Sequence, residues 1–257
     1  MVLTPRAQDL VAEASERILL EHPTGLRHAE LLAALRDELP QQKLNTLRGS
    51  IQKISQRDDA PWTKSSYGFY RHKSITAEQA DQAVTDEIIN KNLCEADYYE
   101  PLAQWLVDNL VECDKATVLG GSALRQKWGT PDVVGVKRCG IRDVIKFEME
   151  IVTAEVKLEP RELITAFGQA VAYRLFSNRV YIAVPTEAAE DDKARLEALC
   201  MLFGIGLVLF PLDANMDDID FQLRVRAARH EVDFSFQNEF LNTLDSKRPD
   251  VFKNLFG

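Results

Sequence analysis

The segment VIKFEMEIVTAEVKL, residues 144–158, decides how the larger part of this chain folds. Its apolar and polar residues alternate, which is typical of a β-strand with one buried face. The alternation then changes phase, because Ile151 is apolar at an odd position whereas Glu155 and Lys157 are charged at odd positions. A continuous strand would place both charges on the same face as the core residues, and the alternative is a bulge near residues 152–153 that redirects them.

A carboxylate that can accompany these charges lies upstream. Asp132, in the segment GTPDVVGV, begins the preceding predicted strand and lies 23 residues before Glu155. Burying charges without a partner or a metal ion is costly, so compensation is expected. Two carboxylates can hold one or two Mg²⁺ ions, which prefer oxygen ligands. Lys157 can orient or deprotonate a metal-bound water, or stabilise charge on a phosphate.

The order and spacing of Asp132, Glu155 and Lys157 resemble the PD…ExK motif of the PD-(D/E)XK nuclease superfamily. The resemblance implies an α/β, restriction endonuclease-like mixed sheet flanked by helices. It also implies Mg²⁺-dependent phosphodiester hydrolysis, with Mn²⁺ able to substitute. Asp132 and Glu155 would be metal ligands, and the carbonyl of Val156 a further one.

Other residues extend this resemblance. Gln169 and Tyr173 form a QxxxY pair on one face of the next predicted helix, and some branches of the superfamily carry this pair beside the active site. Glu100, near the start of an earlier helix, corresponds to a further metal-proximal acid. The alternatives are purely structural: Tyr173 as a core aromatic residue, Gln169 as a solvated helix residue, and Glu100 as an acid that favours a helix N-terminus. Glu148 and Glu150 are interpreted as a solvated edge, with Glu150 as a reserve candidate.

Residues 1–74 predict a small separate domain of three helices and a hairpin. The third helical pattern, KLNTLRGSIQKISQR, places Leu44, Leu47, Ile51 and Ile54 on one stripe. This order is that of a winged helix-turn-helix. The segments HAELLAALRDELP, NTLRGSIQKIS and KSSYGFYR resemble winged modules of the HARE type, which implies binding of duplex DNA.

The polar face of the third helix and the hairpin carry residue types suited to base-edge and phosphate contacts. The candidate DNA-binding residues are Asn45, Arg48, Gln52, Lys53, Gln56, Lys64, Tyr67 and Arg71. The alternatives are a merely solvated face and a protein-interaction module.

Charge is distributed unevenly along the chain. Residues 1–74 contain 11 Lys or Arg and 9 Asp or Glu, whereas residues 75–257 contain 20 and 31, so the net charges are +2 and −11. Nucleic-acid binding must therefore depend on local sites. The four cysteines show no CxxC spacing and no apolar run is long enough for a membrane span, so we expect a cytoplasmic protein without membrane contact.

These observations predict three parts: a winged helix-turn-helix domain over residues 1–74, a linker helix over 75–92, and a nuclease-like domain over 93–257. The first hypothesis is a metal-dependent endonuclease of restriction or defence type that cleaves double-stranded DNA. The alternatives are a non-cleaving DNA-binding or regulatory protein and an RNA-directed nuclease. A homodimer, or a protein partner docked on the acidic domain, is also considered. The tail, residues 213–257, is given no function.

Overall fold

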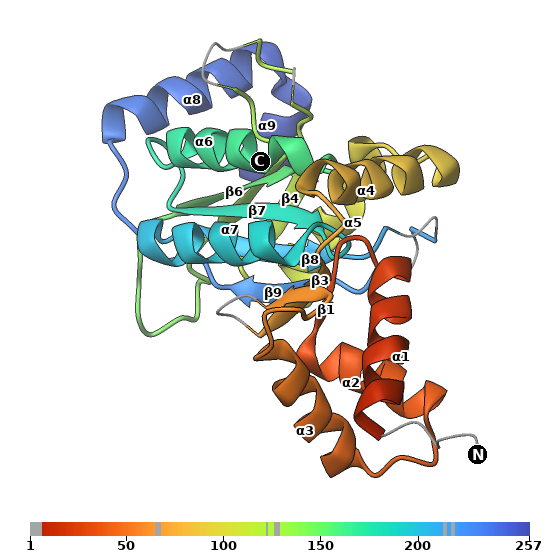
Figure 1. The fold of residues 1–257 in the computed structure, drawn as a ribbon. Coiled ribbons are helices and arrows are strands. Elements are labelled where there is room, and N and C mark those ends of the chain that lie inside the picture. The colour runs from red at the N-terminus through yellow and green to blue at the C-terminus, as the bar shows by residue number, and fades with distance from the viewer. Residues whose placement is uncertain (1–6, 65–67, 122, 126–128, 213–214, 217–218) are drawn as a thin grey trace, which may run out of the picture. The chain divides into compact units, whose positions relative to one another are not determined.

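The computed structural model describes residues 7–64, 68–121, 123–125, 129–212, 215–216 and 219–257 (Figure 1). The chain divides into two compact units, Met1–Asp86 with Ala188–Ala194, and Glu87–Glu187 with Arg195–Gly257. The predicted linker helix is α4 (Ala77–Lys91), and the division falls within it. In the described part of the chain, no helix is long and apolar enough to cross a membrane.

Within its described residues, the first unit contains the three predicted helices and a small antiparallel sheet, and the first strand of that sheet lies between the first two helices. The elements are α1 (Ala7–Glu21), β1 (Leu26–Arg27), α2 (His28–Glu38), α3 (Leu44–Ser55), β2 (Trp62–Lys64) and β3 (Phe69–His72). The sequence did not indicate β1, which pairs with β3 and gives the strand order β1-β3-β2. Two residues are too few to leave a periodic signal.

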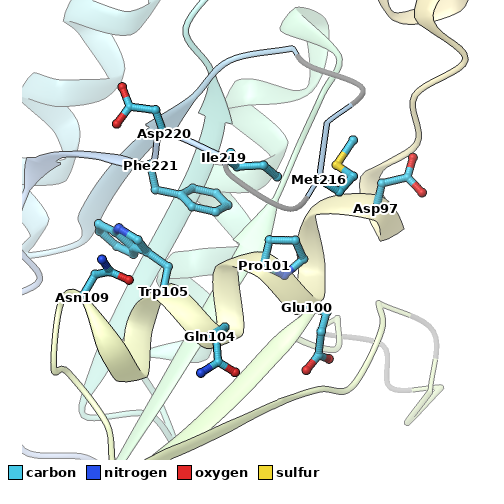
Figure 2. A pocket seen from close by; sticks show the side chains of 10 residues that line it. All are labelled: Asp97, Glu100, Pro101, Gln104, Trp105, Asn109, Met216, Ile219, Asp220 and Phe221. Atoms are coloured by element: carbon cyan, nitrogen blue, oxygen red, sulfur yellow. The ribbon is translucent and has the colours of Figure 1, made fainter.

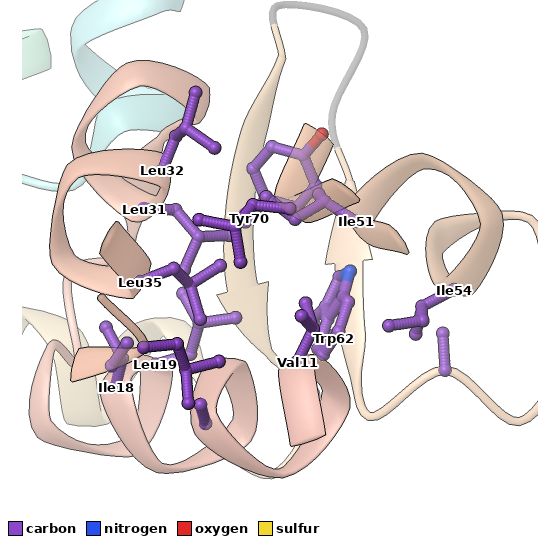
Figure 3. Close-up of a cluster of buried hydrophobic side chains, with 14 residues drawn as sticks. Val11, Ile18, Leu19, Leu31, Leu32, Leu35, Ile51, Ile54, Trp62 and Tyr70 are labelled. Carbon is purple, nitrogen blue, oxygen red and sulfur yellow. The ribbon is translucent and has the colours of Figure 1, made fainter. Parts of the chain in front are cut away.

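The apolar stripes of the three helices meet in one core, which Trp62 and Tyr70 complete from the sheet (Figure 3). From α3, the predicted residues Leu47, Ile51 and Ile54 are buried. Leu44 is 41% exposed, because it is the first residue of the helix and lies beyond the core. The opposite face of α3 is therefore left to solvent.

The second unit is built on a mixed sheet that has six strands in the described residues, in the order β4-β5-β6-β7-β8-β9. The strands are β4 (Lys115–Val118), β5 (Val133–Lys137), β6 (Glu150–Val156), β7 (Arg179–Pro185), β8 (Gly206–Phe210) and β9 (Gln222–Val225). The pairs β6-β7 and β7-β8 are parallel, and the other neighbours are antiparallel. This confirms the predicted α/β class with a mixed sheet.

Helices flank this sheet, and Figure 1 shows α6 and α7 running roughly along the direction of β7. The helical elements are η1 (Glu95–Tyr98), α5 (Tyr99–Asp108), η2 (Pro160–Glu162), α6 (Leu163–Tyr173), α7 (Glu190–Phe203), α8 (Phe234–Lys247) and α9 (Pro249–Phe256). α5 packs against β4 and β5, and α6 against β6 and β7. The tail contributes β9, α8 and α9, and α8 and α9 share a core with residues of β5 and β6.

The structure resolves the phase change in the 144–158 segment. β6 pairs with β5 and with β7 without a register shift, so the bulge alternative is wrong and the strand is continuous. All seven residues of β6 are buried, since neighbours cover both faces. The strand begins only at Glu150; Val144 and Ile145, expected within it, lie outside it and are exposed.

Glu150 also differs from its prediction. It is 5% exposed rather than part of a solvated edge, and it forms ion pairs with Arg179 and Arg229. Both partners lie far along the chain, so the alternation around Glu150 contained no sign of them.

Candidate active site

Antiparallel pairing of β5 with β6 brings Asp132 beside Glu155. Val133 lies opposite Ala154, and the backbone N–H of Asp132 donates to the carbonyl of Ala154 at 3.0 Å. One residue further, the N–H of Val156 donates to Asp132 Oδ2 at 2.9 Å. The carboxylate of Asp132 thus takes the place of a backbone acceptor at the end of the strand pair. The 23-residue separation in sequence is bridged by the hairpin between the two strands.

Both carboxylates are buried, each 1% exposed, and each is held by a tyrosine. Tyr99 hydrogen-bonds to Asp132, and the hydroxyl of Tyr173 donates to Glu155 Oε2 at 2.9 Å. A Cβ at Gly129 would lie 2.9 Å from the Tyr173 hydroxyl, and the backbone there has φ +90°. Only glycine lets this loop approach the hydroxyl so closely.

Lys157 completes the cluster by contacting two acids. Its Nζ lies 3.3 Å from Glu155 Oε1 and 3.0 Å from Glu95 Oε2. Burial by itself would lower the pKa of Lys157, but the hydrogen bond from Lys157 to Glu95 and the charges of Glu155, Glu95 and Asp132 raise it above its ordinary value. Lys157 is therefore a cation at neutral pH in this arrangement, which favours a charge-stabilising role over that of a base.

The two acids have raised pKa values. Burial and then the charge of Asp132 raise the pKa of Glu155 to about 7, against the opposing effects of Lys157 and Tyr173. Burial also raises the pKa of Asp132, although the N–H of Val156, the Tyr99 hydroxyl and Lys157 oppose it. Two carboxylates that cannot both ionise easily are a common feature of functional sites.

The donor set suits a hard cation such as Mg²⁺. Asp132 and Glu155 offer carboxylate oxygens, and a bound cation would relieve the burial that raises their pKa values. The buried Oε1 of Gln169 has no hydrogen-bond partner among the described residues, so it is available to a ligand or a water. Across those residues, no group of three or more His, Cys, Asp or Glu side chains is arranged to hold a metal ion. Waters would have to supply the remaining ligands, as is common for Mg²⁺.

The structure brings together most of the predicted site residues, but not Glu100. That residue is exposed on α5, where it lines a surface pocket with Asp97 and Trp105 (Figure 2). Besides Glu155, the acid that contacts Lys157 is Glu95, and neither Glu95 nor Tyr99 was predicted from the sequence. The only indication in the sequence was an acid and a tyrosine near the start of a predicted helix. The short η1 turn before α5 changes which residues of this segment lie against the cluster. Val156, the predicted carbonyl ligand, is placed in the site by its N–H bond to Asp132.

In the first unit, the predicted DNA-binding residues of α3 and β2 lie on the surface. All six candidates among them are exposed: Asn45, Arg48, Gln52 and Lys53 on α3, Gln56 directly after that helix, and Lys64 on β2. Burial and then the charges of Lys64 and Arg48 lower the pKa of His28, so both cations lie close enough to His28 to affect it. Arg71 is half-buried, 3.9 Å from Asp191 of the same unit, and Tyr67 lies outside the described residues.

No family model, no curated protein and no solved structure matches this chain. The functional proposal therefore rests on the geometry of the site.

The pKa of Glu155 predicts how stability depends on pH. Its value is about 7 in the folded chain against an ordinary 4.5, so the folded state holds a proton that the unfolded chain has lost between these pH values. The free energy of unfolding without metal should therefore fall as pH rises from about 4.5 to 7. Glu155→Gln should be more stable than wild type at pH 8 by on the order of 1–3 kcal/mol, and this gain should shrink towards pH 5.

Urea unfolding in EDTA, followed by circular dichroism from pH 5 to 8, measures this difference. Glu100→Gln is the matched control and should follow the wild-type profile, because its side chain is exposed. Parallel wild-type and Glu155→Gln profiles would show that Glu155 ionises as freely in the folded chain as in the unfolded one.

Proposed function

We propose that this chain is a metal-dependent DNA endonuclease of restriction or defence type, belonging to the PD-(D/E)XK superfamily. The observation that carries the proposal is the meeting of Asp132, Glu155 and Lys157 at the adjoining ends of β5 and β6. Burying two acids and a lysine in a sheet costs more free energy than burying apolar residues. Their presence at this position therefore favours a catalytic role.

In this mechanism, Asp132 and Glu155 would hold Mg²⁺, and Mn²⁺ could replace it. The metal would lower the pKa of a bound water and neutralise charge on the phosphate. Lys157, kept protonated by Glu95 and Glu155, stabilises the negative charge that builds on the phosphate during attack. Tyr99 and Tyr173 hold the two carboxylates in position.

The first unit would act as a winged helix-turn-helix that holds duplex DNA. Three helices, a strand between the first two, and the hairpin of β2 and β3 that completes the sheet β1-β3-β2 support this proposal, and so does the exposed polar face of α3. Gly49 lies on that helix, and a Cβ there would meet nothing within 4 Å, so the helix surface is open at this point. Amide side chains such as Gln52 suit adenine edges, and Arg48 and Lys64 suit phosphates.

Cleavage of supercoiled plasmid tests the catalytic proposal. With Mg²⁺ or Mn²⁺, the wild-type protein should nick or linearise the plasmid, and EDTA should abolish the reaction. Lys157→Ala should lower the rate by at least about 10²-fold, because it removes a cation from the developing charge. Lys146→Ala is the matched control, since Lys146 is an exposed lysine outside the site.

Equal rates for wild type and Lys157→Ala would contradict the assignment of the site. DNA that is shifted on a gel but never cut would favour the non-cleaving binding protein. Cleavage of RNA with intact plasmid would favour the RNA-directed nuclease.

Salt-dependent binding tests the DNA-binding surface. Arg48→Gln and Lys64→Gln should each weaken binding to a duplex and reduce the slope of log affinity against log salt by about 1, because each removes one phosphate contact. Fluorescence anisotropy over a series of KCl concentrations measures both. Arg36→Gln on α2, another exposed arginine, should bind as wild type. Unchanged affinity and slope in the two variants would place the DNA-binding surface elsewhere.

A further inference from the structure

A second cluster of charged side chains lies at the opposite end of β6 from Glu155. It lines a cavity of about 490 Å³ and contains Glu112, Glu150, Lys137, Arg179, Arg226 and Arg229. β6 begins at Glu150 in this cavity and carries Glu155 near its other end, so the two sites are separated by the length of the strand.

The two carboxylates form the buried floor of the cavity. Arg179 joins them, with Nη1 3.0 Å from Glu112 Oε1 and Nε 3.1 Å from Glu150 Oε2. The hydroxyl of Tyr181 also donates to Glu112, at 2.8 Å. Both buried acids therefore have partners within the floor itself and do not depend on the outer arginines for compensation.

Arg226 and Arg229 form a more open rim. Arg226 Nη2 lies 2.9 Å from Glu112, and Arg229 Nε lies 2.5 Å from Glu150. Their side chains are 57% and 42% exposed. Each guanidinium has five N–H donors, and these contacts use only part of that capacity. The floor acids thus hold the two rim arginines in place while leaving donors for a ligand.

The cavity carries an excess of positive charge. Its lining has four cations and two carboxylates, a net charge of +2, in a part of the chain, residues 75–257, whose net charge is −11. Like charges gathered in this way repel one another, and an anion with two charges would balance them. Guanidinium groups match phosphate oxygens with paired hydrogen bonds. Phe147, 37% exposed, adds an aromatic surface to the same lining.

We propose that this cavity binds the phosphate group of a nucleotide-sized phosphorylated small molecule. Arg226 and Arg229 bind the phosphate, Lys137 and Arg179 add to the attractive field, and Phe147 contacts the aromatic part of the ligand. The volume lies within the range of ordinary small-molecule pockets. This site is independent of the proposed nuclease activity.

Isothermal titration calorimetry on the full chain tests the proposal, with adenosine 5′-monophosphate, inorganic phosphate and adenosine as probes. Chloride keeps the ionic strength equal throughout. The monophosphate should bind saturably at one site, phosphate more weakly, and adenosine not measurably. The double variant Arg226→Gln/Arg229→Gln should weaken monophosphate binding at least tenfold, because both rim guanidinium groups are lost.

Two control variants show whether the monophosphate binds in this cavity. Arg224→Gln, which loses an arginine paired with Glu197 outside the cavity, should bind the monophosphate as wild type. Lys157→Ala should also bind it as wild type, which excludes binding at the candidate active site. In the double variant both floor acids are still paired with Arg179. Circular dichroism shows whether this variant folds. If it does not fold, the single variant Arg229→Gln replaces it in the binding test.

Phosphate that binds as tightly as the monophosphate would still support the site, with recognition of the phosphate alone. No binding of either phosphate probe at low ionic strength would overturn the proposal. Binding that the arginine variants leave unchanged, or that Lys157→Ala abolishes, would overturn it as well.

Discussion

The register between β5 and β6 is the constraint on which the site depends. The N–H of Asp132 bonds to the carbonyl of Ala154, and the N–H of Val156 bonds to the carboxylate of Asp132. Because a side chain completes the hydrogen bonding at the end of the strand pair, one hairpin sets both the fold and the relative placement of two acids. A shift by one residue would turn Glu155 to the other face of the sheet.

The structure handles buried acids differently at the two ends of β6. Glu150 is paired with two arginines, so its burial is compensated by the fold itself. Glu155 has Tyr173 and a lysine shared with Glu95, yet burial and Asp132 still hold its pKa at about 7. The burial of Glu155 is thus only partly compensated, so a bound cation would stabilise this site. Functional sites of this kind commonly lower the stability of the fold.

Local patterns predicted much of this protein. Helical stripes and strand alternation indicated the order of elements, and the PD…ExK spacing brought out three residues that do lie together. Residues fixed by distant or irregular structure could not be predicted. The η1 turn places Glu95, rather than Glu100, against Lys157. Val144 looked like part of a strand, but β5 ends at Lys137 and β6 begins at Glu150, so it has no strand partner among the described residues.

If Asp132 and Glu155 hold a metal ion as proposed, Mn²⁺ binding followed by electron paramagnetic resonance detects it without relying on turnover. We expect that wild type binds Mn²⁺, that Mg²⁺ competes for the same site, and that Asp132→Asn and Glu155→Gln each lose the binding. Glu100→Gln should retain it, because that carboxylate is exposed and lines a separate pocket. Equal Mn²⁺ binding by wild type, Asp132→Asn and Glu155→Gln would contradict a metal site at these two acids.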